Sequence, residues 1–194
     1  MEERKRMPDR RREWTRAEIL NAAWEIARRD GIAALSLREI AAKVGMRAPS
    51  LYTYFPSKNA LYDAMYAQGM REFAEQLGNS PPGRDPQQRF RNRVKAWANA
   101  AVEDPFRFEL LFQRPIPGFT PSAESLAIGL TSLEETRRIA AAAGLRSRRS
   151  LDMLLGVTRG LAGTQNANEP GGRRWVGLID EALDILIAHY ARSD

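Results

Sequence analysis

Hydrophobic positions along this chain of 194 residues recur at helical spacing through most of its length. Apolar residues fall at i, i+3, i+4 and i+7, the pattern of a helix that buries one face. The segments that show this pattern are 15–30, 36–44, 49–55, 57–77, 86–102, 105–114, 121–143, 146–168 and 172–192. No run of useful length alternates apolar and polar residues as a strand does. The pattern therefore predicts an all-α protein.

Polar residues and prolines mark where several of these helices begin. Ser36 with Glu39, and Thr15 with Glu18, have the spacing of a capping box, in which each side chain bonds a free backbone N–H. Three later helices combine a capping residue with proline at the first helical position, where a missing N–H costs nothing. These pairs are Asp85–Pro86, Asp104–Pro105 and Thr120–Pro121.

The stretch from 36 to 58 has the plan of two short helices joined by a tight turn. Gly45 ends the first helix, because glycine readily adopts the left-handed conformation found there. After a turn over residues 46–48, Pro49 begins the second helix and Pro56 ends it. This arrangement is typical of a helix-turn-helix, whose second helix enters the major groove of DNA.

The second helix of this motif carries hydroxyl and aromatic side chains, which can bond phosphates and base edges. We expect Arg38 and Lys58 to hold phosphates at its flanks. The residues expected at or near the groove are Arg47, Ser50, Tyr52, Thr53 and Tyr54. Two short helices around a glycine turn also occur in proteins that never contact DNA, so spacing alone leaves both interpretations open.

Positive charge is concentrated in the first third of the chain. Residues 1–58 contain 13 Lys and Arg against 8 Asp and Glu, which is +5 of the total net charge of +6. Residues 1–13 are too polar to bury a face, so they are expected to form a disordered basic arm. The arm either follows DNA phosphates or the minor groove, or is a solvated tail, and the two interpretations stand about equal.

The run from Trp14 to about Leu77 resembles the N-terminal DNA-binding domain of the tetracycline-repressor (TetR) family. The matching pieces are ILNAAWEIA (19–27), SLREIAAKVG (36–45) and APSLYTYFPSKNAL (48–61). The resemblance implies a three-helix DNA-binding domain over 14–57 and a helical body over 58–194 that binds a ligand and dimerises. It also implies that the helix from 58 to 77 joins the two parts and transmits the ligand signal by its tilt.

The same resemblance implies a homodimer formed by the helices at about 146–168 and 172–192. Both helices have apolar stripes, and Gly156 and Gly160 would permit close approach of two backbones. The stripes could instead simply pack inward. Two reading helices about one helical turn of DNA apart, ~34–36 Å, would recognise a palindrome.

The body contains more apolar and aromatic bulk than its helices strictly need, and small molecules often bind between helices. In segment 57–77, two adjacent apolar rows make a face too broad for contact with one neighbour. The candidate pocket residues are Trp97, Phe108, Leu111, Phe112, Met153, Val157 and Trp175, each of which could equally be core. Arg159 lies on an otherwise apolar helix and could pair with an anionic ligand, or with Glu or Asp across the dimer.

The sequence offers little for catalysis. It has no cysteine and one histidine, His189, so neither a His/Cys zinc site nor a His-paired nucleophile is expected within one chain. No apolar run approaches the ~20 residues of a membrane span, and no secretory signal is present. We therefore expect no catalytic residue, metal or cofactor, no membrane contact, and a cytoplasmic location.

These observations favour a ligand-responsive, sequence-specific DNA-binding transcriptional regulator, a repressor that a small-molecule effector releases from its operator. The alternative is a sequence-independent DNA-coating protein, which would keep the salt dependence of binding and lose base selectivity. An enzyme is a distant third interpretation.

Overall fold

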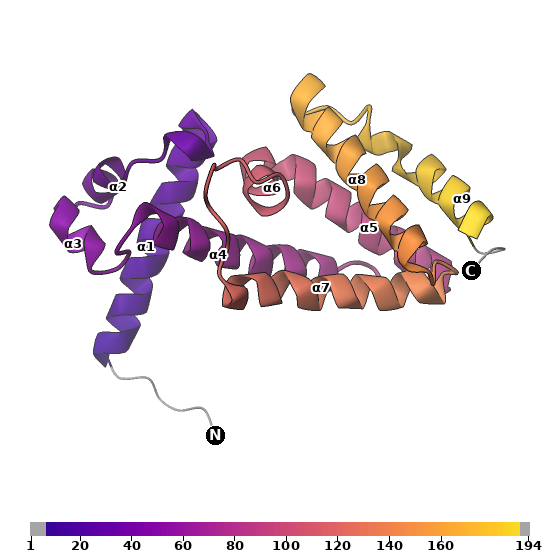
Figure 1. Ribbon diagram of the computed structural model, residues 1–194, viewed down its shortest axis with the longest axis horizontal. Coiled ribbons are helices and arrows are strands. Elements are labelled where there is room, and N and C mark those ends of the chain that lie inside the picture. Colours follow the sequence, from indigo (N-terminus) through magenta and orange to yellow (C-terminus); the bar gives the residue numbers. More distant parts are fainter. Residues whose placement is uncertain (1–6, 191–194) are drawn as a thin grey trace.

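The computed structural model describes residues 7–190, which consist of helices and connecting turns with no strand in that range (Figure 1). The α-helices are α1 (Met7–Asp30), α2 (Leu37–Lys43), α3 (Ala48–Tyr52), α4 (Lys58–Gly78), α5 (Pro86–Glu103), α6 (Pro105–Phe112), α7 (Ala123–Ala142), α8 (Arg148–Asn168) and α9 (Ile179–Tyr190). Two 3₁₀ turns, η1 (Ile32–Ala34) and η2 (Val176–Leu178), interrupt the connections. The prediction of an all-α fold is confirmed.

The helices α1, α2 and α3 gather at one end of the molecule with the start of α4 (Figure 1). Their apolar faces form one core, because the apolar stripe of α1 packs against the buried residues of the two shorter helices. Its fully buried members include Ile19, Trp24, Ile26, Ile40, Leu51 and Phe55. This N-terminal unit therefore folds around α1.

The helix α4 belongs to both parts of the molecule. Leu61 and Met65, near its start, lie in the N-terminal core, whereas Phe73 and Leu77 pack in the body. The helix α6 also reaches the N-terminal core, through Leu110. The apolar face that the sequence shows to be too broad for one neighbour is thus divided between two cores.

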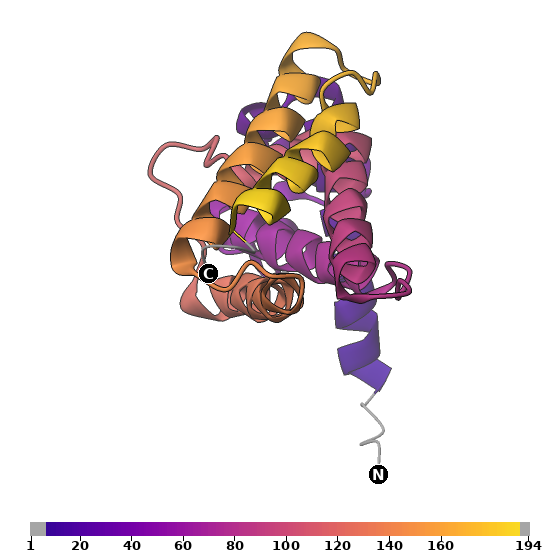
Figure 2. The ribbon, with the colours of Figure 1, turned by 90° about the vertical axis from the view of Figure 1, so that its right-hand side faces the viewer.

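The rest of the body surrounds the second half of α4. The helix α7 runs beside α4, while α8 and α9 form an antiparallel pair that packs on α5 (Figures 1 and 2). The core between α5, α8 and α9 is formed by residues such as Phe90, Val94, Leu154, Leu183 and Leu186. Among residues 7–190, this packing leaves one face of the α8–α9 pair uncovered (Figure 2).

The start of α1 differs from the prediction. Residues 7–13, expected to belong to a disordered arm, form the first turns of the helix, and residues 1–6 lie outside the described range. Thr15 is therefore inside the helix, where its hydroxyl donates to the carbonyl of Arg11 (2.9 Å) and caps nothing. Arginine and glutamate are good helix formers, so a helix anchored by its packed C-terminal half can continue into a polar run.

Other helix starts follow the sequence in part. Asp85 and Asp104 cap α5 and α6 as predicted, accepting from Gln88 N (2.8 Å) and Arg107 N (3.1 Å). The start predicted at Thr120–Pro121 is wrong, since α7 begins at Ala123 with Ser122 as its cap. Ser147 caps α8 in the same way, and the segment 172–192 divides into η2 and α9, with residues 191–194 outside the described range.

The capping box at Ser36 is not formed. Ser36 occupies the N-cap position of α2 by its backbone, but its side chain makes no capping hydrogen bond. Glu39 turns to α1 and forms an ion pair with Arg29. The guanidinium of Arg29, from α1, thus binds the Glu39 carboxylate that the local spacing predicts at the cap of α2.

Candidate nucleic-acid interface and ligand cavity

The turn between α2 and α3 has the hydrogen bonding of a Schellman motif. Met46 N donates to Ala41 O (2.8 Å) and Gly45 N donates to Ala42 O (3.1 Å). Gly45 has a φ of 70°, and a Cβ added there would meet no atom within 4 Å. Its left-handed backbone, and not a lack of space, is what favours glycine at this turn.

The helix α3 is held from inside by Leu51, with Phe55 just beyond its end, both buried. Pro49 lies in its first turn, as predicted. Of the residues expected at the groove, Arg47, Ser50, Tyr52 and Thr53 are exposed, and Tyr54 is partly exposed. Tyr52 keeps 51% of its surface exposed, so its ring and hydroxyl are accessible to a partner.

The two residues expected to hold phosphates differ in their surroundings. Arg38 is exposed on α2. Lys58 donates from Nζ to the carbonyl of Ala33 (3.2 Å) and lies over the ring of Tyr62 (5.4 Å from its centroid). Because an ammonium has three N–H donors, Lys58 can brace α4 against η1 and still face an anion.

Arg12 and Arg16 of α1 support α3 from behind, a role that the sequence analysis missed. Arg16 donates to the carbonyl of Tyr54 (2.6 Å) and stacks over the ring of Phe55 (4.3 Å). Arg12 donates to the carbonyl of Thr53 (3.4 Å). Their spacing of four is a signal for one helix face, but it becomes readable only once α1 is known to extend to Met7.

The same end of α1 brings positive charge beside α3. Arg11 and Arg12 line a hollow with Thr53 and Tyr54. The pKa of the Arg16 guanidinium is lowered, first by burial and second by the charge of Arg12. An anion bound at this hollow would relieve that repulsion, since an opposite charge favours the charged form.

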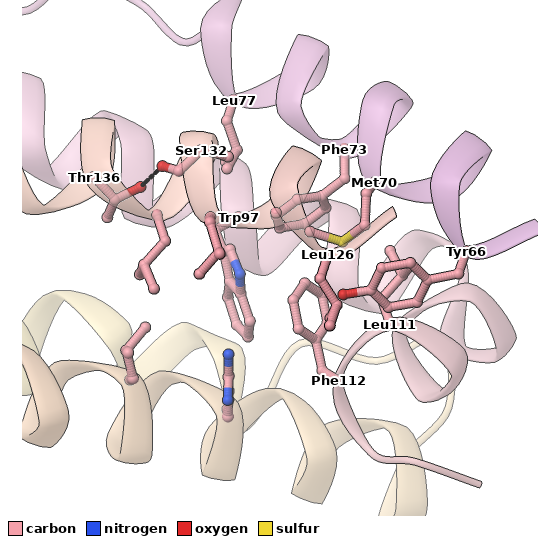
Figure 3. Close-up of a pocket in the computed structure, with 15 residues that line it drawn as sticks. Tyr66, Met70, Phe73, Leu77, Trp97, Leu111, Phe112, Leu126, Ser132 and Thr136 are labelled. Carbon is pink, nitrogen blue, oxygen red and sulfur yellow. Dashed lines mark hydrogen bonds between the residues drawn. The ribbon is translucent and has the colours of Figure 1, made fainter. Parts of the chain in front are cut away.

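A second candidate site is a cavity of about 270 Å³ in the body, between α4, α5, α6, α7 and α8 (Figure 3). The residues that line it are Tyr66, Met70, Phe73, Leu77, Trp97, Leu111, Phe112, Leu126, Gly129, Leu130, Ser132, Leu133, Thr136, Leu155 and Arg159. Phe73, Trp97 and Phe112 form one wall, with ring centroids 5.2–6.3 Å apart in edge-on or tilted contacts. Such contacts hold aromatic side chains in a fixed arrangement.

A few polar groups interrupt this apolar lining. The hydroxyl of Thr136 donates to the carbonyl of Ser132 (2.9 Å), as Figure 3 shows, so it is already bonded. Tyr66 lines the cavity from α4, and the guanidinium of Arg159 lies 5.3 Å from the ring centroid of Phe112. Burial lowers the pKa of Arg159, an effect that Tyr66 opposes.

The pocket residues expected from the sequence fall into two groups. Trp97, Leu111 and Phe112 line the cavity, and Phe108 packs behind them against Trp97 (5.9 Å between ring centroids). The other three, Met153, Val157 and Trp175, are not among the lining residues.

Their positions explain why they stay outside the cavity. On α8, Leu155 and Arg159 face the cavity, whereas Met153 is 46% exposed. Trp175 lies in the connection before η2, where its backbone N–H donates to Oε1 of Gln165 (2.8 Å). The sequence analysis did not identify the lining residues of α4 and α7, although the broad apolar face of α4 indicated some of them.

Within residues 7–190, no cluster of three or more His, Asp or Glu side chains could hold a metal ion. No helix in the same range is both long enough and apolar enough to cross a membrane.

Comparison with known proteins adds to this geometry. Residues 19–65 match the family model described as bacterial regulatory proteins of the tetR family. The chain is 33% identical over 98 residues to the HTH-type transcriptional repressor KstR of Rhodococcus jostii (strain RHA1), which covers 50% of this chain and 45% of KstR. It is 27% identical over 95 residues to YobS of Bacillus subtilis (strain 168), an uncharacterised HTH-type transcriptional regulator, covering 49% and 50% of the two chains. The chain thus spans about half the length of the curated relatives it matches.

Solved structures are similar over almost the whole chain. SCO4313, described as a candidate regulatory protein, has a TM-score of 0.77 at 25% identity, covering 93% of this chain and 98% of its own. The TetR family regulator PfmR of Thermus thermophilus has a TM-score of 0.65 at 19% identity, covering 88% and 97%, and shows likeness of fold. The fold and the exposed α3 define a helical protein with an N-terminal helix-turn-helix. Residues 19–65 thus match the tetR family of bacterial regulatory proteins, and the fold of the whole chain is similar to that of a solved TetR family regulator.

Proposed function

We propose that this protein is a sequence-specific DNA-binding transcriptional regulator, a repressor that acts in the cytoplasm. The observation that carries the proposal is the exposure of Ser50 and Tyr52 on α3 and of Thr53 at its C-terminal end. Arg16 of α1 holds that end in place through the carbonyl of Tyr54. The relative KstR is named a transcriptional repressor, which favours repression over activation. A binding role, and not catalysis, is the function that these residue types support.

In this proposal α3 lies in the major groove of DNA. Ser50, Tyr52 and Thr53 would contact base edges, with Arg47 and Tyr54 at the rim of the groove. Arg38 and Lys58 would hold phosphates on either side. Arg11 and Arg12 would add phosphate contacts, one of the two roles that the sequence left open for residues 1–13, but from a helix and not from a disordered arm.

The protein would bind a palindromic operator as a homodimer through α8 and α9. Large apolar side chains stay exposed on this pair and on η2, which leads into α9: Met153 is 46% exposed, Leu178 42% and Ile185 63%. A Cβ added at Gly156 or Gly160 would meet no atom within 4 Å, so this face of α8 has room for a second backbone. One reading module buries only ~600–1,000 Å², which makes a second copy valuable for selectivity.

A small molecule in the cavity would release the repressor from DNA. The cavity is bordered by the second half of α4, whose first half lies in the core of the N-terminal unit. The helix α6, which also lines the cavity, contacts α1 directly, because Asp104 pairs with Arg28 (2.6 Å) and Arg107 lies over Trp24 (4.9 Å). The ligand must bind the DNA-incompetent arrangement more tightly, since equal binding to both would change nothing.

The proposal is tested by comparing substitutions of a base-contacting and a phosphate-contacting residue. Tyr52→Ala or Thr53→Ala should change which sequences are preferred, with a change of about 1–3 kcal/mol for the affected base pair. Arg38→Gln should weaken binding to all sequences about equally and lower the salt dependence. Both are measured by fluorescence anisotropy against a panel of duplexes. A uniform loss in every variant would favour the DNA-coating protein instead.

A further inference from the structure

We propose that the cavity in the body binds an organic anion, a carboxylate with a small apolar body, whose charged group pairs with Arg159. The idea deepens the proposed ligand control and rests on it for its biological role. Binding of the anion itself requires neither DNA nor a DNA-binding function, so the two can be tested separately.

The walls of the cavity favour a ligand whose uncharged part is apolar. Most of the lining is Leu, Met, Phe and Trp side chains from the surrounding helices, and burying the matching surface of a ligand is favourable by about 25 cal/mol per Å². The volume of about 270 Å³ lies just below the range of ~300–1,000 Å³ typical of ligand pockets. The site therefore suits a small molecule.

Arg159 selects the charged group. It is the one charged residue among those that line the cavity, and no carboxylate within residues 7–190 lies at ion-pair distance from it. Its guanidinium already stacks over Phe112 and is partly removed from water, as its lowered pKa reflects. A planar guanidinium offers two parallel N–H donors, which match the two oxygens of a carboxylate.

Tyr66 can supply a second donor. Burial raises the pKa of its hydroxyl, which therefore keeps its proton at neutral pH. A Cβ added at Gly129 would lie 3.7 Å from this hydroxyl and 2.6 Å from Cε of Met70. Glycine at this position of α7 thus leaves room for the end of the Met70 side chain, next to the hydroxyl of Tyr66.

Carboxylates of the surrounding helices are engaged elsewhere. Asp63 of α4 accepts from the backbone N–H of Ser122 (2.7 Å), and from the hydroxyls of Ser122 and Ser125 (3.0 Å each). Glu135 of α7 lies 3.5 Å from the guanidinium of Arg93. Arg159 is therefore available to a carboxylate brought by the ligand.

The test is isothermal titration calorimetry of the full chain without DNA, using octanoate and its neutral analogue octanol as probes. We expect octanoate to bind more tightly than octanol. Arg159→Gln should weaken octanoate binding roughly ten- to a hundredfold, the usual effect of losing a charge-assisted hydrogen bond, and should leave octanol binding unchanged. The matched control is Arg149→Gln, which removes the same charge from an exposed position of α8 outside the cavity and should alter neither.

Several results would overturn the anion site. These are no binding of octanoate by the unaltered chain, equal affinity for octanoate and octanol, or equal losses in Arg159→Gln and Arg149→Gln. Sedimentation of the same variants tests the competing role of Arg159 across a dimer interface. A variant that becomes monomeric but keeps its octanoate affinity would assign Arg159 to that interface. Intact octanoate binding in a chain that selects no DNA motif would instead contradict the proposed regulator and support the anion site.

Discussion

At the scale of single residues, Arg93 holds three helices of the body together. Its side chain is almost completely buried, and it donates to the hydroxyl of Thr136 (2.9 Å), the carbonyl of Ser132 (3.2 Å) and the carbonyl of Leu77 (3.4 Å). Burial lowers the pKa of Arg93, and the nearby carboxylate of Glu135 opposes that shift. One guanidinium from α5 thus joins the end of α4 to α7.

Replacing Arg93 by methionine should therefore lower the free energy of unfolding by about 2–4 kcal/mol. The substitution removes three hydrogen bonds that a charged group makes in a buried place, and such bonds contribute more than neutral ones. Urea unfolding followed by circular dichroism measures the change. Arg89→Met, at an exposed position of the same helix, is the control and should stay within about 0.5 kcal/mol of the unaltered chain. Equal effects of the two substitutions would show that the buried hydrogen bonds contribute nothing.

The buried stripe of α1 could be predicted from sequence residue by residue, whereas the partners of polar side chains could not. Ile19, Ala23 and Ile26 are buried as their spacing indicates. Glu39, by contrast, has the correct spacing to cap α2 and instead pairs with Arg29. The burial of an apolar residue follows from the period of its own helix. The partner of a charged side chain depends on which groups the tertiary packing brings near it.

At the scale of elements, the turns of α1 before residue 14 carry charges that the proposed function places on DNA. These turns place Arg11 and Arg12 beside the exposed end of α3, where a disordered arm would leave their positions undefined. Fixed charges of this kind add phosphate contacts without the entropic cost of ordering a tail on binding.

The double substitution Arg11→Gln and Arg12→Gln should weaken binding to all DNA sequences and leave sequence preference unchanged. Loss of two phosphate contacts should reduce the slope of log affinity against log salt by about 1.8. Anisotropy titrations over a range of salt concentrations measure that slope. The control is Arg137→Gln with Arg138→Gln, the same loss of charge at exposed positions of α7. An unchanged slope in the first pair would remove α1 from the DNA interface.

The helix α8 shows why pocket residues were harder to predict than helices. The sequence defines α8 to within two residues of its start, and Met153 and Val157 are as apolar as Leu155. Only Leu155 and Arg159 turn to the cavity, because α4 and α7 lie on that side of the helix. A helical period reveals that faces exist, but which neighbour covers each face depends on the packing of distant segments.

At the scale of the whole molecule, α8, η2 and α9 carry large apolar side chains that the described residues leave exposed. They are Met153, Leu178 and Ile185. A monomer would leave this surface to water, whereas a dimer would bury it and set two copies of α3 at a fixed separation. In the proposed dimer, selectivity for a palindrome would thus depend on a surface far from α3.

Ile185→Asp should convert the protein from a dimer to a monomer. A carboxylate buried without a partner costs several kcal/mol, and about 3 kcal/mol weakens association roughly a hundredfold. Sedimentation velocity at micromolar concentration measures the oligomeric state. Leu130→Asp is the control, because Leu130 is equally exposed (62% against 63%) but lies on α7. A stable monomer in the unaltered chain would refute the proposed dimer directly.

The central claim is that this chain reads DNA sequence, and selection from random duplexes tests it most directly. The purified full chain would be used at ~150 mM salt, where purely electrostatic binding is weak. The account predicts recovery of a palindrome whose half-sites lie about one helical turn of DNA apart. Recovery of no motif, with binding that disappears as salt rises, would contradict it and indicate a protein that coats DNA without reading it.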